Sequence, residues 1–513
     1  MVRQLGLLVA LLLVGDTAAS SKESVRRFHL NGWYETEPEA LRRQLVECAK
    51  RANDHYNADL KETRAVIIPH AGYRYSGALS AAGLRLFDPK SIKKIILLAP
   101  CHSWVAAEAK AFVTNEQRYE LPLGSLALDL EGAQQLVKKN KKLFMWGADV
   151  NQVQHGSGNP FDKEHSMEIE LPLLQHYLPD VVVLPIIVGH DLSPKQCEEI
   201  ARALKPYIDA STGIVVSSDF IHFGKSYDFF PFKEKTCQLE RLRAISNEVM
   251  QPIFDRSFSA FQAVLEKTKA NVCGYEPISI LLSLLTDAQF KRSVAYLVGY
   301  ATSSDGKNDQ KEIMEGTVTY GVIGFARPHI TAIPYLTEYE KRALLTYATE
   351  AVQQRFSKKC GADLIMPIVS PGLQEECGTF VTLKDAKGVL RGCIGTVIPR
   401  EPLYKSVVNN AYSAAFADRR FSPLESRELS GLQVEISLLS KPVEVGRDKV
   451  KLTDGVILEF GEKSALFLPE VAQEQKWDLP TMFTELSRKA GLPSQAWKDK
   501  KAVFKVFNAA KIS

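Results

Sequence analysis

The chain contains 513 residues, a length that typically corresponds to two or three domains. Its 45% hydrophobic and 24% charged residues are ordinary for a globular protein, which excludes wholesale disorder, a collagen-like fibre and a membrane protein with many spans. The formal net charge is only +4, from 64 Lys and Arg against 60 Asp and Glu, and no basic stripe stands out. We therefore expect a folded protein that does not bind nucleic acid.

The first 20 residues have the pattern of a targeting segment. Arg3 precedes an apolar run of 11 residues, Leu5 to Gly15, and small residues follow through Ser20. Because a membrane-spanning helix needs about 20 apolar residues, this run predicts a cleaved signal peptide, with no stable membrane span after cleavage. A functional leader would place the protein in the secretory pathway or outside the cytoplasm; otherwise we expect a cytoplasmic protein.

Residues 21–329 alternate short apolar runs with amphipathic stretches, a pattern typical of a sheet covered by helices. The runs that predict strands buried on both faces are Ala65–Ile68, Lys94–Leu98, Val181–Val188, Gly213–Ser217 and Ser293–Val298. Helices are predicted at Ser76–Leu86, Glu131–Lys139 and Pro194–Leu204, a surface loop at Asp305–Lys311 and a last strand at Gly316–Phe325. These elements indicate a three-layer α/β domain.

A second, smaller unit is predicted at residues 338–513, after a linker at 330–337. It begins with a helix at Tyr339–Lys358, and another helix is expected at Tyr404–Ala417. Strands are predicted at Gly378–Leu383, Leu390–Ile394 and Leu432–Leu439. Helices and strands alternate less regularly here, so the pattern favours an α+β domain.

Three histidines each follow an apolar strand of the first unit: His70, His102 and His222. Ligands bind at the carboxyl ends of strands in open α/β sheets, so these imidazoles are expected to converge although they are far apart in sequence. A lone histidine at a strand end is more often a hydrogen-bonded structural residue. Three at one edge of a sheet favour a functional site.

The turn after the first predicted strand carries two glycines. Gly72 is expected to take a positive φ in a tight turn, Ser76 to cap the following helix, and Gly77 to allow close backbone approach. An ordinary strand-to-helix turn would explain these glycines equally well, but it would not explain His70.

Other side chains are candidates for the same site. Asp219 precedes His222 by three residues, so it could orient the imidazole or share acid-base work, or the two form an ordinary surface pair. His165 lies in a stretch rich in acids, which a solvated helix start explains equally well. Cys273 by itself would be interpreted as a buried core thiol.

Five segments occur in order along the first unit: PHAGYRYSG from Pro69, APCHS from Ala99, EHSMEIELPLL from Glu164, SSDFIHFG from Ser217 and NVCGYEPI from Asn271. Together they resemble the Memo family. That family shares its fold with the class III extradiol dioxygenases, which open catechol rings with non-heme iron(II). The resemblance implies a three-layer α/β sandwich of the class III extradiol dioxygenase type, with a pocket suited to a metal ion.

The resemblance assigns the family's metal ligands to His70, His102 and Cys273, with Asp219 and His222 lining the same pocket. The dioxygenases carry a carboxylate where this sequence has Cys273. Two imidazoles and a carboxylate suit Fe(II) and O₂, whereas a thiolate also accommodates Cu(I) or zinc. We therefore expect iron or copper as the cofactor rather than zinc.

The second unit resembles the AMMECR domain, above all in the heptapeptide LRGCIGT, Leu390–Thr396. This resemblance implies a compact α+β fold. Arg391 could grip a carboxylate or phosphate, so Arg391, Cys393 and Thr396 are candidates to line a cleft that binds a small molecule, a peptide or a cofactor. A glycine-rich packing seam explains the motif equally well. The last histidine is His329, which argues against Cys-His catalysis in this unit.

The leading hypothesis is a metal-dependent redox protein, in its finer form a non-heme iron dioxygenase-like oxidoreductase. In it His222 acts as acid-base, Asp219 orients His222, and His165 is a further catalytic candidate. The alternative is a non-catalytic metal-binding or peptide-binding scaffold that retains the dioxygenase fold. Zinc-assisted hydrolysis is a third interpretation.

The expected ligand is a small molecule or a peptide. The fusion of the two units resembles gene neighbourhoods in which Memo-like and AMMECR proteins occur beside a radical-SAM enzyme. The chain itself carries no Cys-x₃-Cys-x₂-Cys cluster motif, so a radical-SAM protein is a candidate partner rather than a part of this chain.

Overall fold

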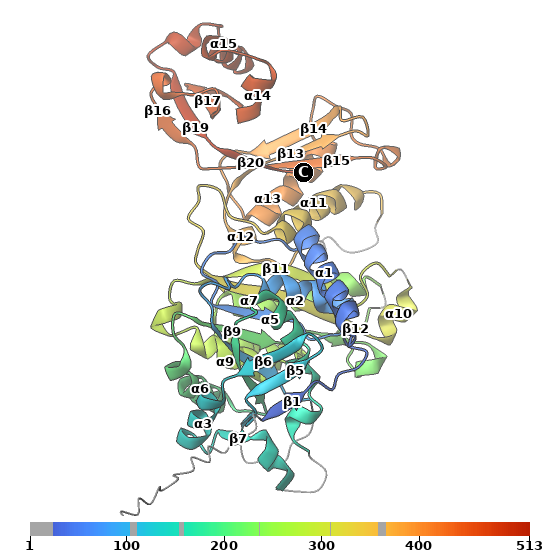
Figure 1. Ribbon diagram of the computed structural model, residues 1–513. Helices are drawn as coiled ribbons and strands as arrows, with labels where there is room; N and C mark the ends of the chain where they lie inside the picture. The colour runs from blue at the N-terminus through green and yellow to red at the C-terminus, as the bar shows by residue number, and fades with distance from the viewer. Residues whose placement is uncertain (1–23, 103–109, 153–157, 235, 308, 358–365) are drawn as a thin grey trace, which may run out of the picture.

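The computed structural model describes residues 24–102, 110–152, 158–234, 236–307, 309–357 and 366–513 (Figure 1). The predicted signal peptide at residues 1–20 lies outside the described residues. Within the described ranges, no helix is long and apolar enough to cross a membrane. The chain forms a larger unit, coloured blue to yellow in Figure 1, and a smaller unit coloured gold to red.

A mixed sheet of 12 described strands forms the centre of the larger unit. Its central strands, β8 (Val182–Val188), β3 (Lys94–Pro100), β9 (Thr212–Ser217) and β2 (Ala65–Ile68), are neighbours in that order and run parallel. β12 (Thr317–Ala326) pairs antiparallel with β2, and β11 (Val294–Thr302) pairs antiparallel with β12. Almost every residue of these strands is buried, which is why the sequence shows them as continuous apolar runs.

Six shorter strands complete this sheet: β1 (Val25–Arg27), β4 (Ala111–Val113), β5 (Arg118–Leu121), β6 (Gly124–Leu128), β7 (Phe144–Trp146) and β10 (His222–Phe223). The sequence patterns predicted the long strands to within a few residues but none of these six. Runs of two to five residues carry too little periodicity to be recognised.

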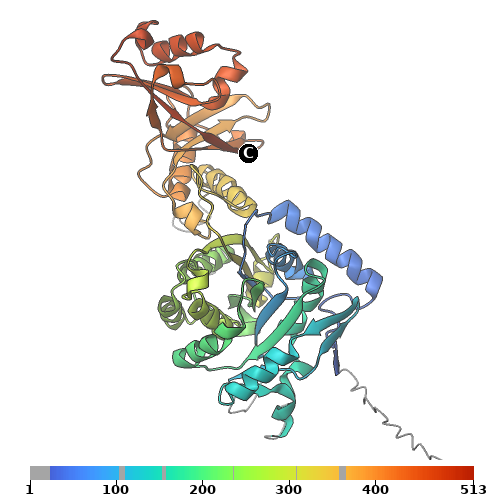
Figure 2. The same cartoon turned by 60° about the vertical axis from the view of Figure 1, so that its left-hand side comes forward.

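Helices cover both faces of the sheet, as Figure 2 shows. One face carries α1 (Pro38–His55), α2 (Tyr73–Leu84) and α5 (Leu171–Tyr177), and the other carries α6 (Pro194–Leu204), α7 (Gln238–Phe254), α8 (Phe258–Thr268) and α9 (Tyr275–Leu284). The remaining helices of this unit are α3 (Leu130–Lys139), α4 (His165–Glu168) and α10 (Gln310–Glu315). Each face buries its own apolar cluster, so the predicted three-layer α/β architecture is confirmed.

The predicted first residue is correct for α6 and wrong for α2. α6 begins as predicted at Pro194, because Ser193 and Gln196 form a capping box. α2 begins three residues before the predicted Ser76: Gly72 is the N-cap with a φ of −51°, and the Ser76 hydroxyl donates to the Ala71 carbonyl (2.8 Å). The predicted positive φ of Gly72 and the predicted cap at Ser76 are therefore wrong.

Two further expectations had different outcomes. At Gly77 a Cβ atom would lie 2.8 Å from Cys48 Sγ, so the predicted close approach is confirmed, with α1 as the neighbour. The predicted loop at 305–311 is partly helical, since α10 begins at Gln310. Asp309 caps this helix by accepting from the Lys311 amide (2.8 Å).

The smaller unit has two sheets and is α+β, as predicted. The first sheet contains β14 (Leu390–Thr396), β13 (Gly378–Lys384), β15 (Gln433–Leu439) and β20 (Ala509–Ile512), and α11 (Glu338–Gln353), α12 (Pro371–Gln374) and α13 (Leu403–Phe416) pack near it. The second sheet contains β16 (Val443–Val445), β19 (Val503–Phe507), β17 (Gly455–Phe460) and β18 (Lys463–Phe467), with α14 (Pro469–Glu474) and α15 (Leu479–Lys489). This second sheet was not predicted.

The helix α11 joins the two units. Its N-cap residue Thr337 forms a capping box with Glu340, and the Thr337 hydroxyl donates to the carbonyl of Leu297 in β11 (2.8 Å). Further along the chain, the Val369 amide donates to Asn247 Oδ1 of α7 (2.7 Å). Figure 1 shows α11 and α13 between the large sheet and the two small ones.

Candidate metal centre

The ends of three parallel strands determine where the candidate site lies. β2, β9 and β3 are direct neighbours in the sheet, so the residues that follow them meet at one edge. His70 follows β2 by two residues, and His102 follows β3 by two residues. The structure brings one ligand atom each of His70, His102 and Cys273 within 4.8 Å of one another. Strand positions predicted that His70, His102 and His222 meet at this edge, and the family resemblance added Cys273. The structure groups His222 with Asp219 and Cys273 rather than with the other two imidazoles.

His70 is buried and firmly oriented. Its backbone amide donates to Asp219 Oδ1 (2.9 Å), and its Nδ1 lies 2.8 Å from the Ser217 hydroxyl. That hydroxyl donates its own proton to the Ser166 carbonyl (2.7 Å), so it accepts from Nδ1. The Nε2 atom therefore carries the free lone pair, and it lies 3.3 Å from Cys273 Sγ. Burial lowers the pKa of His70 well below its ordinary value, so the imidazole is neutral.

His102 is oriented by a carboxylate. Glu164 is fully buried and accepts both from the His102 amide (2.6 Å) and from His102 Nδ1 (2.8 Å). Burial would raise the pKa of Glu164, but the hydrogen bonds from His102 and the nearby imidazoles lower it to about 2. The ionised carboxylate holds the proton on Nδ1, which leaves Nε2 of His102 available as a ligand.

Cys273 closes the group from the opposite side, just before α9. At Gly274 a Cβ atom would lie 2.3 Å from the Ser218 Cβ, so only glycine lets this turn approach β9. Burial raises the pKa of the Cys273 thiol well above its ordinary value. The raised pKa favours the protonated thiol, and a bound cation would favour its thiolate form.

His222 lies on the far side of Cys273, with its Nε2 3.9 Å from Sγ. Its Nδ1 faces the carbonyls of Phe220 and Asn271, both at 3.2 Å, and the Asn271 side chain accepts from its backbone amide (2.9 Å). Asn271 and Phe220 thus orient His222, and not Asp219 as expected. The carboxylate of Asp219 instead holds the backbone of His70, and burial raises its pKa to about 7.

His165 is the first residue of α4 and contacts two rings at a tilt. The ring of Trp33 lies at 4.4 Å and that of His102 also at 4.4 Å, measured between centroids. Its Nδ1 is 3.4 Å from Glu164 Oε1, and His102, Glu164 and His165 form a second group of closely spaced ligand atoms. Burial and the neighbouring His102 lower the pKa of His165 to about 4, so it is neutral at physiological pH.

A cavity of about 690 Å³ opens beside this centre. His102 and Cys273 are part of its lining, and so are His190, Asn271 and Glu276. Burial raises the pKa of Glu276 to about 7. The volume lies within the range of small-molecule sites, so a ligand in this cavity would contact the candidate metal ligands directly.

The residue types present suit a transition metal. Two imidazoles and a thiol combine nitrogen and sulfur donors, which iron, copper and zinc accept and which magnesium or calcium does not prefer. Each imidazole gives its other ring nitrogen to a protein oxygen, the arrangement that fixes metal-binding histidines. Sequence reasoning missed these supporting residues, Ser217, Glu164 and Asn271, although all three stand inside the motifs that carry the family resemblance.

The second candidate site does not form one cleft. Arg391 already makes a bidentate ion pair with Glu428 (2.6 and 3.0 Å). A β-bulge at Arg391 interrupts the alternation of side chains along β14, since Leu383 pairs with Gly392 and Lys384 with Leu390. Cys393 lies on one face of this strand. Thr396 lies on the other, where its hydroxyl donates to Asn410 of α13 (3.3 Å).

The glycines of the same strand serve packing. A Cβ atom at Gly392 would lie 2.1 Å from the Ala414 carbonyl of α13, and one at Gly395 would lie 2.3 Å from the Phe380 ring. These contacts support the packing-seam interpretation of LRGCIGT.

The fold and the site together define an α/β protein with a His-His-Cys group at the carboxyl edge of its parallel strands. The family model described as Memo-like protein matches residues 26–321, and the chain belongs to that family. The model described as AMMECR1 matches residues 345–512, so an AMMECR1 domain follows.

The relatives described next each cover part of this chain. A MEMO1 family protein of Schizosaccharomyces pombe is 28% identical over 302 residues, covering 54% of this chain and 92% of its own. The human protein MEMO1 is 26% identical over 296 residues, covering 55% and 92%. A solved structure of an uncharacterised protein from Pyrococcus horikoshii is 33% identical and covers 33% of this chain and 88% of that one, with a TM-score of 0.30.

Proposed function

We propose that this Memo-like protein binds one iron or copper ion through His70, His102 and Cys273 and uses it in redox chemistry. The observation that carries the proposal is the convergence of these three ligand atoms within 4.8 Å from segments more than 30 residues apart. Two features support it. The imidazoles of His70 and His102 are each fixed by a hydrogen bond through Nδ1, and a cation bound beside Cys273 would stabilise the thiolate form of that residue.

The chain's own residues divide the remaining work. When bound, iron or copper would supply electron transfer, including transfer toward O₂ in a dioxygenase-like oxidoreductase. His222 holds its proton on Nδ1 against two carbonyls and faces Cys273 with its Nε2, the nitrogen that would act as a general base. Burial lowers the pKa of His222, which keeps this base neutral.

Asp219 and His165 shape the same pocket. Asp219 accepts the backbone amide of His70 and so fixes the position of that ligand. His165, in contact with the rings of Trp33 and His102, supplies a second neutral imidazole to the pocket wall.

The ligand we propose is a small molecule or a short peptide segment bound in the cavity beside Cys273, because that cavity reaches both His102 and Cys273. A radical-SAM protein is proposed as a partner, in keeping with the fusion of the two units. The apolar run at Leu5–Gly15 supports export into the secretory pathway, with the cytoplasm as the alternative location.

A non-catalytic metal-binding or peptide-binding scaffold is the second candidate function. The feature that favours it is Cys273, a thiol at the position where the dioxygenases carry a carboxylate. A thiol ligand suits retention of a soft metal as well as O₂ chemistry. If the protein binds iron or copper but consumes no O₂ in the presence of catecholic or other aromatic compounds, the scaffold function is favoured.

Anaerobic purification of the full chain, followed by elemental analysis and spectroscopy of the bound metal, tests the proposal. We expect close to one iron or copper ion per chain, lost in His70→Ala and in Cys273→Ala. His176→Ala, at an exposed histidine of α5, and Cys197→Ala, at a buried thiol of α6, are the matched controls and should keep the ion. Full metal content in both site variants would refute the assignment, and zinc without redox response would favour hydrolysis.

A further inference from the structure

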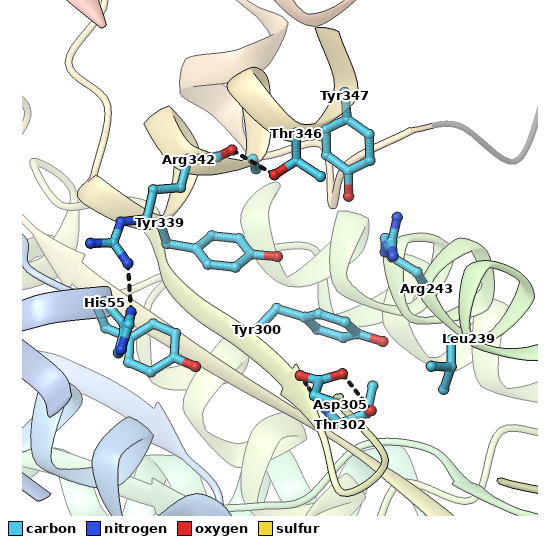
Figure 3. A pocket seen from close by; sticks show the side chains of 12 residues that line it. His55, Leu239, Arg243, Tyr300, Thr302, Asp305, Tyr339, Arg342, Thr346 and Tyr347 are labelled. Carbon is cyan, nitrogen blue, oxygen red and sulfur yellow. Dashed lines mark hydrogen bonds between the residues drawn. The ribbon is translucent and has the colours of Figure 1, made fainter. Parts of the chain in front are cut away.

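A second cavity, of about 310 Å³, lies where α11 meets the first unit (Figure 3). It shares no lining residue with the cavity beside Cys273. Its walls come from the end of α1, from α7, from β11 and the turn after it, and from one face of α11. A ligand here would contact both units of the chain at once.

Tyrosines form the flat walls of this cavity. Tyr339 and Tyr347 are eight residues apart on α11 and therefore share one helix face. Tyr300 comes from β11, and the ring of Tyr56 lies 6.4 Å from that of Tyr339. Figure 3 shows the hydroxyls of Tyr300, Tyr339 and Tyr347 pointing into the same space as the guanidinium of Arg243. Aromatic walls with hydroxyl tips suit a flat ligand that carries a polar group.

The side chain of Arg243 favours a negatively charged ligand. It projects from α7 with its guanidinium 5.4 Å from the centre of the Tyr347 ring. Its Nη1 atom is buried and has no hydrogen-bond partner within the described ranges of the chain. An unsatisfied guanidinium donor in a buried position is costly, and an oxyanion is the group that satisfies it best.

The other charged groups of the cavity are already engaged. Both carboxylate oxygens of Asp305 accept from Thr302, one from its amide (2.9 Å) and one from its hydroxyl (2.7 Å). Arg342 donates to His55 Nδ1 and to the Asp54 carbonyl, so its charge is held at the rim. Glu350 of α11 lies outside the lining but interacts electrostatically with Arg243 and offsets part of its charge. Arg243 is thus the cation that faces the interior.

We infer that this cavity binds a small aromatic monocarboxylate, with the carboxylate on Arg243 and the ring between the tyrosines. One inward-facing cation balances one negative charge. The carboxylate of Asp305 on the same lining disfavours a dianion such as a phosphate monoester. The volume is at the lower end of small-molecule sites, which fits a single substituted ring.

Calorimetric titration of the full chain with benzoate, benzyl alcohol and phenyl phosphate tests this inference. We expect benzoate to bind at least about tenfold more tightly than the neutral alcohol or the dianion. Arg243→Met should weaken benzoate at least about tenfold, whereas Arg241→Met, at a cation on the same helix that pairs with Glu234, should leave it unchanged. Tighter binding of phenyl phosphate than of benzoate would overturn the assigned class.

A second variant tests the same cavity in case Arg243→Met fails to fold. Tyr347→Phe keeps the ring and removes only the hydroxyl, so it should fold and weaken benzoate several-fold. Hydrogen exchange should show benzoate-dependent protection of α11. Chelation of metal should leave that protection intact, because this cavity is separate from the candidate metal centre. Unchanged benzoate affinity in both variants, or no protection of α11, would overturn the inference.

Discussion

Cys273 and Cys393 are both half-buried free thiols in glycine-containing segments, yet their surroundings are opposite. Cys273 faces Nε2 of His70 at 3.3 Å and Nε2 of His222 at 3.9 Å. Cys393 accepts from the Thr382 hydroxyl (3.3 Å) and lies close to the charges of Arg420 and Lys489. The first thiol lies among candidate metal ligands, and the second lies among cations.

The position of each cysteine in its sheet explains the difference. Parallel strand ends gather residues from distant segments at one edge, so Cys273 meets imidazoles from two other loops. Cys393 sits in the middle of β14, where neighbouring residues alternate between two faces and Gly392 is pressed against α13. A motif on a strand end can therefore build a site, while the same residue types inside a strand mostly build packing.

The largest expected effect separates the two thiols directly. Cys273→Ala should lower the affinity for iron or copper by more than about 100-fold, because one of three protein ligands is lost. Cys393→Ala should leave the affinity unchanged. Competition with a chelator of known affinity measures both. Equal loss in the two variants would place metal binding outside the proposed centre.

Substitution of a glycine should affect stability in the β14 region and metal binding in the Cys273 region. Gly392→Ala puts a Cβ atom 2.1 Å from the Ala414 carbonyl, a backbone atom that cannot easily yield, and should destabilise the protein by roughly 3 kcal/mol or more without loss of metal. Gly274→Ala should displace Cys273 and release metal. Val389→Ala, at an exposed residue beside β14, is the control and should stay within about 0.5 kcal/mol. Thermal unfolding and metal content together distinguish the outcomes.

The helix between the two regions should make stability depend on pH. Burial raises the pKa of Glu340 to about 7, from an ordinary value of 4.5. Since the folded pKa lies above the unfolded one, this contribution to stability is complete below about pH 4.5. It amounts to roughly 3 kcal/mol and is lost as the pH rises to about 7.

Glu340→Gln keeps the capping box and should remove this dependence. When the pH is lowered from 8 to 5, the unfolding midpoint of the wild type should therefore rise relative to that of Glu340→Gln. Glu338→Gln, at the start of the same helix, should show no such trend. A difference that stays constant over this range would mean that Glu340 remains ionised.

The smallest expected effect concerns a residue behind the metal centre. Glu164→Gln removes the charge that orients His102 and should weaken metal binding about 10–100-fold. Glu168→Gln alters an equally buried carboxylate, which holds His29 and Tyr119, and should reduce stability with little change in metal affinity. The reverse result would transfer the supporting role from Glu164 to Glu168.

Much of this fold can be predicted from the sequence because its central strands are long and buried on both faces. Such strands appear as continuous apolar runs, and their parallel order places His70 and His102 at one edge. The sheet of β16–β19 escapes prediction, because β16 and β19 are separated by about 60 residues and pair only after the chain folds back. The orientation of His222 by Asn271 escapes for the same reason: it depends on a contact between segments 49 residues apart.

The two small sheets share one stretch of chain. Within residues 503–512, β19 completes the second sheet and β20 completes the first, whereas the large sheet has its last strand by Ala326. During synthesis the larger unit can therefore fold early, while both small sheets must wait for β19 and β20, on the order of 10–40 s later. Until then β17 and β15 each present an unpaired edge, so the nascent second unit is the part of this protein most exposed to misassociation on the ribosome.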